Sequence, residues 1–495
     1  MGIQYLQPRA DSGEKIHPKP LETLAPDAGF DVSCEMRLLQ DGYAGICFGL
    51  DAEGSGYALL VNHATQAVHF MRSDRGALLR DCGMRRSEFA LDTWIPMRVT
   101  YDGRIIRAWF NANPLDKNPW PKYEFALELQ CQRIALDTGH GTAEFRSIET
   151  RPLKVSNGYA GETFVNPVLP GADPDILLYN GTYYIYNRVP NDPASSEDAY
   201  LIAGDARAKH DQAGDADTIF RAASSEDLVH WSAYTPVFQR DEALAGMFCM
   251  SPNVIHKDGL FYLFFAAGRP GGGESFHIYT AVADSPRGPF RMRSKTPLHT
   301  DTQEIGGMPF MDEDGECYIS YVRFNCGNFI WLQHIRLDNG QVIPDDATLV
   351  HLISPEEDYE ADEYGRIAEG AVLTKHNGWY YMIYATGHYK GHYGEAYAVS
   401  RNIYGPYAKA KENPFLHHHF QVDGCGDGVF VYSKDRSRVA LAYHRHISAQ
   451  EIEPRMTCID RLKFVPNPNG GPDLLTVYGP TSTPQPIPFS DEWNS

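Results

Sequence analysis

Long apolar runs are absent from this chain, and positive charge is scarce. No stretch approaches the 18 consecutive apolar residues that mark a membrane-spanning helix. The 44 Lys and Arg residues are outnumbered by 64 Asp and Glu, which gives a formal net charge of −20 and a pI near 5.4. A surface this acidic repels nucleic acids and anionic membranes, so neither is expected as a partner. The expected ligand is a small neutral molecule.

The chain also lacks the cysteine pattern of a disulfide-rich secreted protein. Its nine cysteines are odd in number and scattered, and they include positions inside expected strands, such as Cys317 and Cys458. Residues 1–20 contain no apolar core of a secretory signal. Reduced thiols without a visible leader predict a cytoplasmic protein, with a signal removed before this sequence begins as the open alternative.

A short pattern recurs five times in the later part of the chain. Each copy has an apolar run, a turn and an aromatic-rich run; a looser fifth copy spans 427–443. The first four copies end their turn at Gly181, Gly259, Gly315 and Gly378. Asn-Gly and Asp-Gly turns between such runs predict β-hairpins. Five copies, about 55–80 residues apart, predict an all-β fold with a five-bladed β-propeller.

The innermost strands of a propeller line one central channel, so equivalent positions of the repeat should meet in space. We call the positions eight to nine residues before each turn glycine the inner column. It contains two acids, Asp173 in the first copy and Glu369 in the fourth. Acid–base hydrolysis needs one ionised carboxylate to accept a proton from water and one protonated carboxyl to donate. The pair is therefore the candidate catalytic site, although an Asp before Pro could also simply start a turn.

Residues 163–465 resemble glycoside hydrolase family 43, five-bladed propeller enzymes that invert configuration. The first matching segment reads Asn166-Pro-Val-Leu-Pro-Gly-Ala-Asp-Pro-Asp-Ile176 and another reads Glu369-Gly-Ala-Val-Leu373. The resemblance implies that Asp173 is the general base and Glu369 the general acid. Further matching segments, a Ser-x-Asp-Leu-x-x-Trp type hairpin and two strand endings before Gly-Pro-Phe/Tyr, span 224–231, 281–290 and 398–407.

The third copy departs from the family pattern. Where the family carries Ile-Asp-Pro, this chain reads Ile305-Gly-Gly307, so the third carboxylate, which tunes the acid and orients the base, is missing at its usual place. Glu304 is the candidate substitute, and Asp301 is a weaker one. Both could equally be loop charges.

The second copy departs as well, because Met250-Ser-Pro-Asn253 replaces a Trp-Ala-Pro-Asp/Glu sequence. Candidate contacts of the sugar are Met250, Asn253, Phe310 and Tyr389. Most other aromatic residues are expected between the blades.

Signals for a metal are weak, and no cofactor is expected to be required. Adjacent histidines at 417–419 would alternate between strand faces, whereas His444 and His446 would share one face. Family 43 members often hold calcium or water in the channel, with Gly-x-Gly-His on the fifth blade. This chain has Gly424-Cys-Gly-Asp427 there, which leaves a structural calcium ion in the channel open.

Residues 1–150 are expected to form a separate domain. Apolar or alternating runs such as 94–101 and 105–110, bounded by Gly and Asp turns, predict an antiparallel β-sandwich. Their order resembles concanavalin-like jelly-roll domains of the LamG or carbohydrate-binding-module type, with packing favoured over sugar binding. Residues 151–163 are expected to be a linker, 164–465 the catalytic propeller, and 466–495 a surface tail.

We therefore expect an exo-acting, inverting glycosidase that removes terminal sugars from oligosaccharides. Among substrates, α-L-arabinofuranosides rank first, then β-D-xylosides, then galactofuranosides or other furanosides. One rival is a carbohydrate-binding propeller without turnover, against which the presence of Asp173 and Glu369 argues. A phosphorolytic or glycosyl-transferring propeller would need a basic pocket, and the inner column contains no Arg or Lys. The sequence predicts no oligomeric state.

Overall fold

The computed structural model describes residues 18–23, 29–75, 77–86, 89–111, 120–129, 133–137, 143–153, 158–188, 218–239, 241–269, 276–324, 327–419, 421–448, 451–467 and 470–494. Outside these residues lie most of residues 1–20, the segment considered for a leader, and part of the expected linker, residues 151–163. The chain divides into two compact units. The first comprises residues 1–165, 411–422 and 464–485, and the second comprises 166–410, 423–463 and 486–495.

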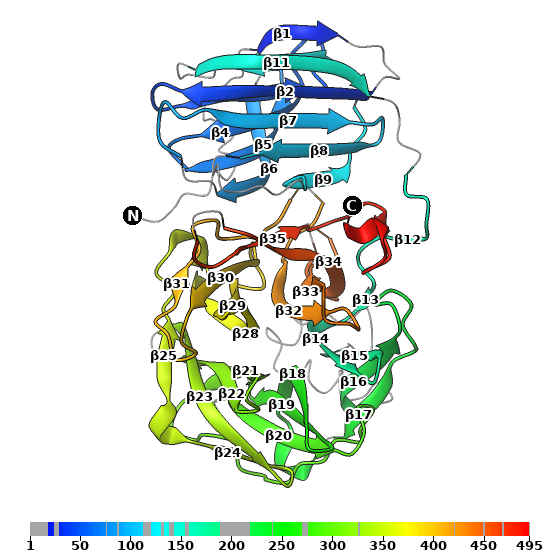
Figure 1. Ribbon diagram of the computed structural model, residues 1–495, viewed down its shortest axis with the longest axis vertical. Helices are drawn as coiled ribbons and strands as arrows, with labels where there is room; N and C mark the ends of the chain where they lie inside the picture. Colours follow the sequence, from blue (N-terminus) through cyan, green and yellow to red (C-terminus); the bar gives the residue numbers. More distant parts are fainter. Residues whose placement is uncertain are drawn as a thin grey trace. The chain divides into compact units, whose positions relative to one another are not determined.

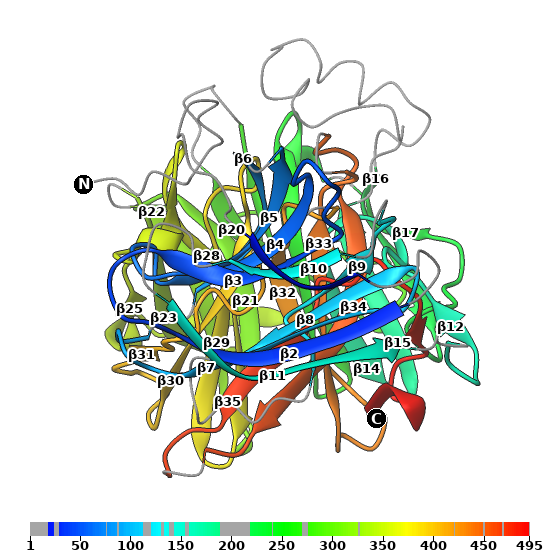
Figure 2. The ribbon, with the colours of Figure 1, turned by 90° about the horizontal axis from the view of Figure 1, so that it is seen from above.

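Two antiparallel sheets with a shared apolar core form the first unit (Figure 1). One sheet has the order β1-β10-β3-β4-β5-β6 and the other β11-β2-β7-β8-β9. Seen from above, β2, β7 and β8 run side by side (Figure 2). The strands are β1 (Pro18–Thr23), β2 (Gly29–Leu38), β3 (Tyr43–Phe48), β4 (Gly56–Asn62), β5 (Ala67–Asp74), β6 (Ala77–Arg86), β7 (Ile95–Tyr101), β8 (Ile105–Phe110), β9 (Tyr123–Ala126), β10 (Arg133–Asp137) and β11 (Ala143–Leu153).

Alternation along β8 shows how the sequence places this core. Ile106, Ala108 and Phe110 are buried, and the residues between them are partly exposed, because successive side chains of a strand point to opposite faces. The buried set joins the cluster that fills the space between the two sheets. The expected antiparallel arrangement of short strands is therefore present in this part of the chain.

Residues 464–485 belong to the first unit and differ from the expected surface tail. Glu124 in β9 is buried and accepts hydrogen bonds from the Tyr478 hydroxyl, the Thr483 hydroxyl and the Gln485 side-chain amide. Arg107 pairs with the same carboxylate at 2.5 Å. A buried charge needs such partners, and here the late segment supplies three of them. This segment includes β35 (Leu474–Tyr478); β12 (Thr163–Phe164) pairs with β36 (Gln485–Pro486).

The second unit is the five-bladed propeller that the repeats predict. Inner strand β14 contacts β18 and β32, β18 contacts β21, β21 contacts β28, and β28 contacts β32, so the ring closes (Figure 1). The last blade is completed by β13 from the start of the unit, which pairs with β34. An antiparallel sheet closed in this way avoids a long unpaired edge.

The blades are numbered in chain order. Blade one contains β14 (Ala172–Tyr179), β15 (Thr182–Arg188), β16 (Thr218–Ser225) and β17 (Thr235–Gln239); blade two contains β18 (Phe248–Lys257), β19 (Leu260–Gly268) and β20 (His277–Ala283); blade three contains β21 (Glu304–Met311), β22 (Cys317–Phe324), β23 (Asn328–Asp338), β24 (Gln341–Pro344) and β25 (Val350–Ile353); blade four contains β28 (Ala368–His376), β29 (Trp379–Thr386), β30 (Gly394–Ser400) and β31 (Ala408–Lys409); and blade five contains β32 (Gly426–Tyr432), β33 (Val439–Arg445), β34 (Met456–Val465) and β13 (Leu169–Pro170). The remaining elements are the paired strands β26 (Ala361–Asp362) and β27 (Gly365–Arg366) and the short 3-10 helices η1 (Glu242–Leu244), η2 (Asp346–Thr348), η3 (Asp358–Glu360) and η4 (Glu492–Asn494).

Three of the predicted hairpin turns have the expected two-residue form. Asn180-Gly181, Asp258-Gly259 and Asn377-Gly378 all have positive φ at both residues, between +48° and +81°. Such turns match the twist of the strands that they join, and Asn, Asp and Gly tolerate this backbone best. The third and fifth hairpins instead have longer turns, 312–316 and 433–438.

Aromatic residues fill the space between blades, as expected. Phe220, Phe265 and Phe290 belong to one buried cluster between blades one and two, and similar clusters lie between the following blades. The expected core position of Cys458 is also found, and burial raises the pKa of its thiol to about 12. None of the described residues forms a helix that is long and apolar enough to cross a membrane.

Candidate active site

The inner strand of every blade carries the same backbone feature. Each strand slips in register against its neighbour over a three-residue step near its start, and the first residue within that step has a positive φ. This is a β-bulge, which bends a strand and redirects a side chain. The five residues at this position are Asp173 (+53°), Ser251 (+54°), Gly306 (+63°), Gly370 (+59°) and Asp427 (+54°).

Asp173 is buried, and both of its carboxylate oxygens accept hydrogen bonds. Oδ1 lies 3.2 Å from Nη1 of Arg455, and Oδ2 accepts from the backbone N–H of Ser251 at 3.2 Å. Two donors, one of them a cation, stabilise the negative form of a carboxyl group. The residue expected to be a base therefore sits where a carboxylate is favoured.

Glu369 immediately precedes the bulge of blade four. Its Oε1 accepts a hydrogen bond from the Tyr393 hydroxyl and its Oε2 accepts one from Asn328 Nδ2, both at 2.8 Å. Burial raises the pKa of Glu369, and the negative charge of Asp173 raises it further, against the two hydrogen bonds and Arg455. Its surroundings thus favour a protonated carboxyl, which is the state a general acid needs.

Asp427 brings a third carboxyl group to the ring. Its carboxylate oxygen, an oxygen of Asp173 and a ring nitrogen of His444 lie within 4.8 Å of one another. Burial raises the pKa of Asp427 well above its usual value, and the charges of Asp173 and Glu369 raise it further. This residue is not in the inner column defined from the sequence, because that column is counted back from turn glycines, and the turn of blade five, 433–438, contains no glycine.

Arg455 and His444 lie next to these carboxyl groups and contact each other. Arg455 Nη1 lies 3.1 Å from His444 Nε2, and the Arg455 side chain is almost fully buried. Burial and the neighbouring positive charge lower the pKa of His444 well below its usual value, so the imidazole is neutral. The inner column contains no Arg or Lys, as the sequence indicates, but Arg455 reaches the site from the residue just before β34.

Glu304 is fully buried, but its contacts lead elsewhere. Oε2 lies 3.1 Å from His299 Nδ1, and Oε1 lies 3.2 Å from Arg323 Nε. Asp301, the weaker candidate, also pairs with Arg323, at 2.7 Å. None of these contacts joins Glu304 to Asp173 or to the acid in blade four, so the structure does not bring it into the carboxyl cluster.

The four candidate sugar contacts are placed in different surroundings. Asn253 is buried and donates to the Ser251 carbonyl at 3.1 Å, which stabilises the bulge of blade two. Met250 begins that bulge and is partly exposed. Phe310 packs edge-on against Tyr380 in the core between blades three and four, away from the carboxyl cluster.

Tyr389 is the candidate that the structure brings to the cluster. The guanidinium of Arg455 lies over its ring, 5.0 Å from the centroid. Its backbone carbonyl accepts a hydrogen bond from His446 Nε2 at 2.6 Å. The loop that holds Tyr389 is therefore anchored to blade five, beside the base.

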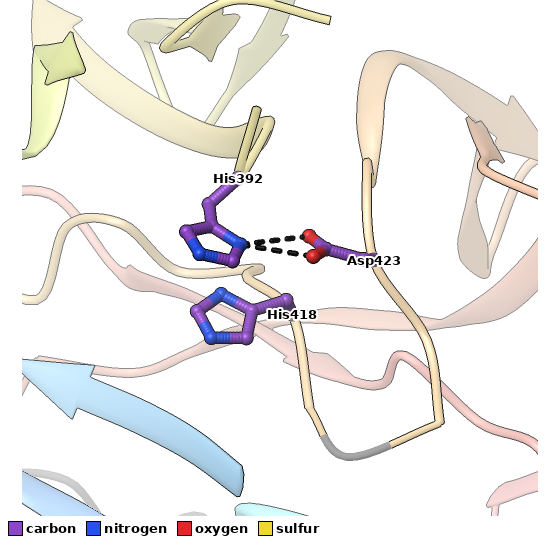
Figure 3. Close-up of side chains that lie close together, drawn as sticks. All are labelled: His392, His418 and Asp423. Carbon is purple, nitrogen blue, oxygen red and sulfur yellow. Dashed lines mark hydrogen bonds and ion pairs between the residues drawn. The ribbon is translucent and has the colours of Figure 1, made fainter. Parts of the chain in front are cut away.

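Tyr393 and its neighbours tie blade four to blade five at the site. The Tyr393 ring stacks on His444 with centroids 5.7 Å apart, and a Cβ on Gly426 would collide with the same ring at 2.0 Å. One residue earlier, His392 Nδ1 lies 2.9 and 3.1 Å from the two oxygens of Asp423 (Figure 3). These contacts fix the hydroxyl that donates to Glu369.

A calcium ion does not suit the donor set beside the base. Calcium prefers six to eight oxygen ligands, whereas this set offers the carboxyl groups of Asp173 and Asp427 and a nitrogen of His444. The positive charge next to Asp173 is already supplied by Arg455 at 3.2 Å. By themselves these described residues therefore supply fewer oxygen ligands than calcium prefers.

The arrangement is suited to moving protons in two directions. One negative carboxylate, held by a cation and a peptide N–H, can accept a proton. One partly exposed carboxyl, Glu369, whose pKa is raised by desolvation, can donate a proton. The two groups are close enough for the charge of Asp173 to raise the pKa of Glu369, so they act on the same space.

Comparison with known proteins agrees with this geometry. Residues 164–469 match the family model described as glycosyl hydrolases family 43. A solved structure, described as a thermostable family-43 glycoside hydrolase, is 27% identical, with a TM-score of 0.54 over 66% of this chain and 100% of that chain.

Two curated relatives extend the comparison. A protein from Xylanibacter ruminicola named as a β-xylosidase is 31% identical over 196 residues, which cover 37% of this chain and 33% of that protein. The β-D-galactofuranosidase xynD of Aspergillus niger is 24% identical over 328 residues, 62% of this chain and 83% of that protein. The chain therefore spans about a third of the first relative and most of the second.

Proposed function

Because this chain belongs to glycosyl hydrolases family 43, we propose that it hydrolyses terminal glycosidic bonds of oligosaccharides with inversion at the anomeric carbon. The observation that carries the proposal is the unequal pair of carboxyl groups. Asp173 is held as a carboxylate by Arg455, whereas burial and the charge of Asp173 raise the pKa of Glu369. Two carboxyl groups in opposite protonation states are what single-step glycoside hydrolysis requires.

In the proposed reaction, Asp173 takes a proton from a water molecule while the water oxygen bonds to the anomeric carbon. Glu369 gives its proton to the glycosidic oxygen as the bond between that oxygen and the anomeric carbon breaks. The products are a free sugar of inverted configuration and the shortened alcohol. Atoms balance, since the water supplies the hydroxyl of one product and the enzyme's two carboxyl groups exchange protons with solvent afterwards.

The proposed substrates are terminal pentosides, with α-L-arabinofuranosides first and β-D-xylosides second. The names of the relatives support a glycoside substrate and include a β-xylosidase and a β-D-galactofuranosidase. Galactofuranosides are accordingly the third class. A neutral sugar also suits a chain with a net charge of −20, because an anionic substrate would be repelled.

A panel of nitrophenyl glycosides tests the proposal. We expect release of nitrophenol from at least one of the three classes, and a loss of that activity in the Asp173→Asn variant. Retained binding of sugars without any turnover by the wild-type protein would instead identify a carbohydrate-binding propeller. Equal activity of the wild-type and Asp173→Asn proteins would contradict the assignment of the base.

A further inference from the structure

Asp427 lies where two carboxyl groups meet. It occupies the bulge position of blade five, as Asp173 does in blade one, and both have φ near +54°. A carboxylate oxygen of Asp427 and one of Asp173 lie within 4.8 Å of each other. Two carboxyls this close cannot both ionise without strong repulsion. One member of the pair is therefore a carboxylic acid.

The neighbours decide which member keeps the proton. Asp173 faces the Arg455 guanidinium and a peptide N–H, which stabilise a negative charge. Asp427 lies against Gly370, where Oδ1 is 2.2 Å from the position that a Cβ would occupy. Burial, Asp173 and Glu369 together raise the pKa of Asp427 well above its usual value, against Arg455. The proton therefore stays on Asp427.

We propose that Asp427 is a positioning residue of the glycosidase site: as a neutral acid, it donates a hydrogen bond to the Asp173 carboxylate and orients that base toward water. This inference rests on the proposed function, since it gives the proposed base a partner. No bond to Asp427 forms or breaks during hydrolysis, and its proton remains in place.

Charged groups surround the cluster. Arg455 pairs with Asp173 and, at 3.0 Å, with Glu453, while Arg188 adds a second positive charge near the neutral His444. Burial raises the pKa of Glu395 on β30 to about 8, and its Oε1 accepts the Gly428 N–H at 2.6 Å. The other titratable groups facing Asp427 are Glu369 on β28 and Tyr393, the residue before β30, and burial raises the pKa of each.

At the bulge position of blade three, which is equivalent to Asp427 in blade five, the residue is a glycine without a side chain. Gly306 has the same left-handed backbone, with φ +63°, and a Cβ there would find its nearest neighbour, the Gly370 backbone nitrogen, at 3.7 Å. Both Gly306 and Asp427 thus approach the same glycine. An aspartate at position 306 could reach the cluster from the other side.

Two substitutions at position 427 separate the proposed role from simple packing. Asp427→Asn keeps a hydrogen-bond donor but cannot ionise, and Asp427→Gly removes the side chain while tolerating the positive φ. We expect the Asn variant to keep kcat within about tenfold of wild type, and the Gly variant to lose roughly 100-fold, as when one oriented donor is removed. The basic limb of the pH–rate profile should be unchanged in Asp427→Asn.

Three results would overturn the proposal. Wild-type kcat in Asp427→Gly would show that the donor is not needed. An Asp427→Asn variant as slow as Asp427→Gly would show that an ionisable group, rather than a neutral donor, is required. In the double variant Asp427→Gly with Gly306→Asp, we expect part of the lost rate to return, and no return would contradict a role for a third carboxyl group at this ring.

A measurement without substrate separates this inference from the proposed function. A carboxyl group whose pKa is higher in the folded than in the unfolded protein costs stability as pH rises above the unfolded pKa of about 3.9. Asp427→Asn should therefore gain Tm relative to wild type between pH 5 and pH 8. If the difference in Tm between Asp427→Asn and wild type is the same at pH 5 and at pH 8, a proton held on Asp427 is contradicted. If the wild-type protein is inactive but the variant still gains Tm over it, only the proposed function is contradicted.

Discussion

Two buried carboxylates in this propeller each have an arginine and a histidine as partners, yet their surroundings differ. Glu304 pairs with Arg323 and His299, and although burial lowers the pKa of His299, the hydrogen bond and charge of Glu304 raise it overall. Asp173 pairs with Arg455, whereas its histidine is neutral. Glu304 thus has a partner for each carboxylate oxygen, Arg323 for one and His299 for the other, and is suited to holding the structure together.

The second difference concerns the groups beyond these partners. Asp173 faces two further carboxyl groups whose pKa values are raised by burial and by its own charge. Glu304 has no such partner among its contacts. A carboxylate with an arginine and a histidine as partners is therefore no evidence of catalysis by itself. What distinguishes the proposed catalytic site from the structural one is a second carboxyl group that faces the first and has a raised pKa. The following predictions test this comparison.

The largest effect is expected at the two proposed catalytic residues. Asp173→Asn and Glu369→Gln should each lower kcat by roughly 10³-fold or more, since each removes a proton-transfer group. Steady-state kinetics measures the loss, and circular dichroism should show an unchanged fold. Activity within tenfold of wild type in either variant would contradict the assigned role.

Glu304→Gln should act on stability instead of catalysis. Removing the negative charge takes away one of the two acidic partners of Arg323 and leaves Asp301 as the other, which costs about 2 kcal/mol of unfolding free energy. Denaturant unfolding gives this value, and kcat per folded molecule should equal that of wild type. A large fall in kcat with normal stability would place Glu304 in the catalytic machinery after all.

Gly370→Ala should disturb the site through Asp427. A Cβ at this position would lie 2.2 Å from Asp427 Oδ1, and φ is +59°, so both the backbone and the third carboxyl must shift. We expect kcat to fall about tenfold or more, since a misplaced catalytic group is costly. Gly181→Ala is the matched control, because its φ is +79° but no atom lies within 4 Å. The control should lose about 1 kcal/mol of stability and no activity.

The smallest effect is expected at Asp175, whose Oδ2 accepts the Val254 N–H at 2.7 Å. Burial raises the pKa of Asp175 to about 7, against that hydrogen bond. Because the folded value exceeds the unfolded value of about 3.9, this group lowers stability as pH rises from about 4 to about 7. Asp175→Asn should flatten this fall in Tm and leave kcat unchanged. A steeper fall in the variant would reverse the assigned sign.

The repeats and their turns could be predicted well from the sequence. Asn180-Gly181 and two counterparts encode two-residue hairpins through local backbone preference, and together with two hairpins that have longer turns they make the five repeats of the propeller. The acid pair was also found, because Asp173 and Glu369 lie at fixed distances from those turns. Asp427 was missed since a longer turn follows its strand, and Arg455 because it lies outside the inner strands.

At two other places the structure differs from the sequence-based prediction because the partners of a residue are far away in the sequence. Glu304 has the charge expected of a substitute third carboxylate, but Arg323 and His299 determine where it lies. Likewise, residues 466–495, which are rich in Pro, Gly and Thr, are predicted to be a surface tail, whereas Tyr478 within them donates a hydrogen bond to the buried Glu124 of the first unit. No local sequence pattern predicts such a pairing. Its stabilisation comes from hydrogen bonds to a charged group that other parts of the fold bury.

The anomeric configuration of the first product tests the central claim most directly. Proton NMR during hydrolysis of the best nitrophenyl glycoside, recorded before mutarotation, distinguishes the two anomers. A base at Asp173 that activates water opposite the acid at Glu369 predicts a product of inverted configuration, lost in Asp173→Asn and preserved in Glu304→Gln. A product of retained configuration would contradict this account.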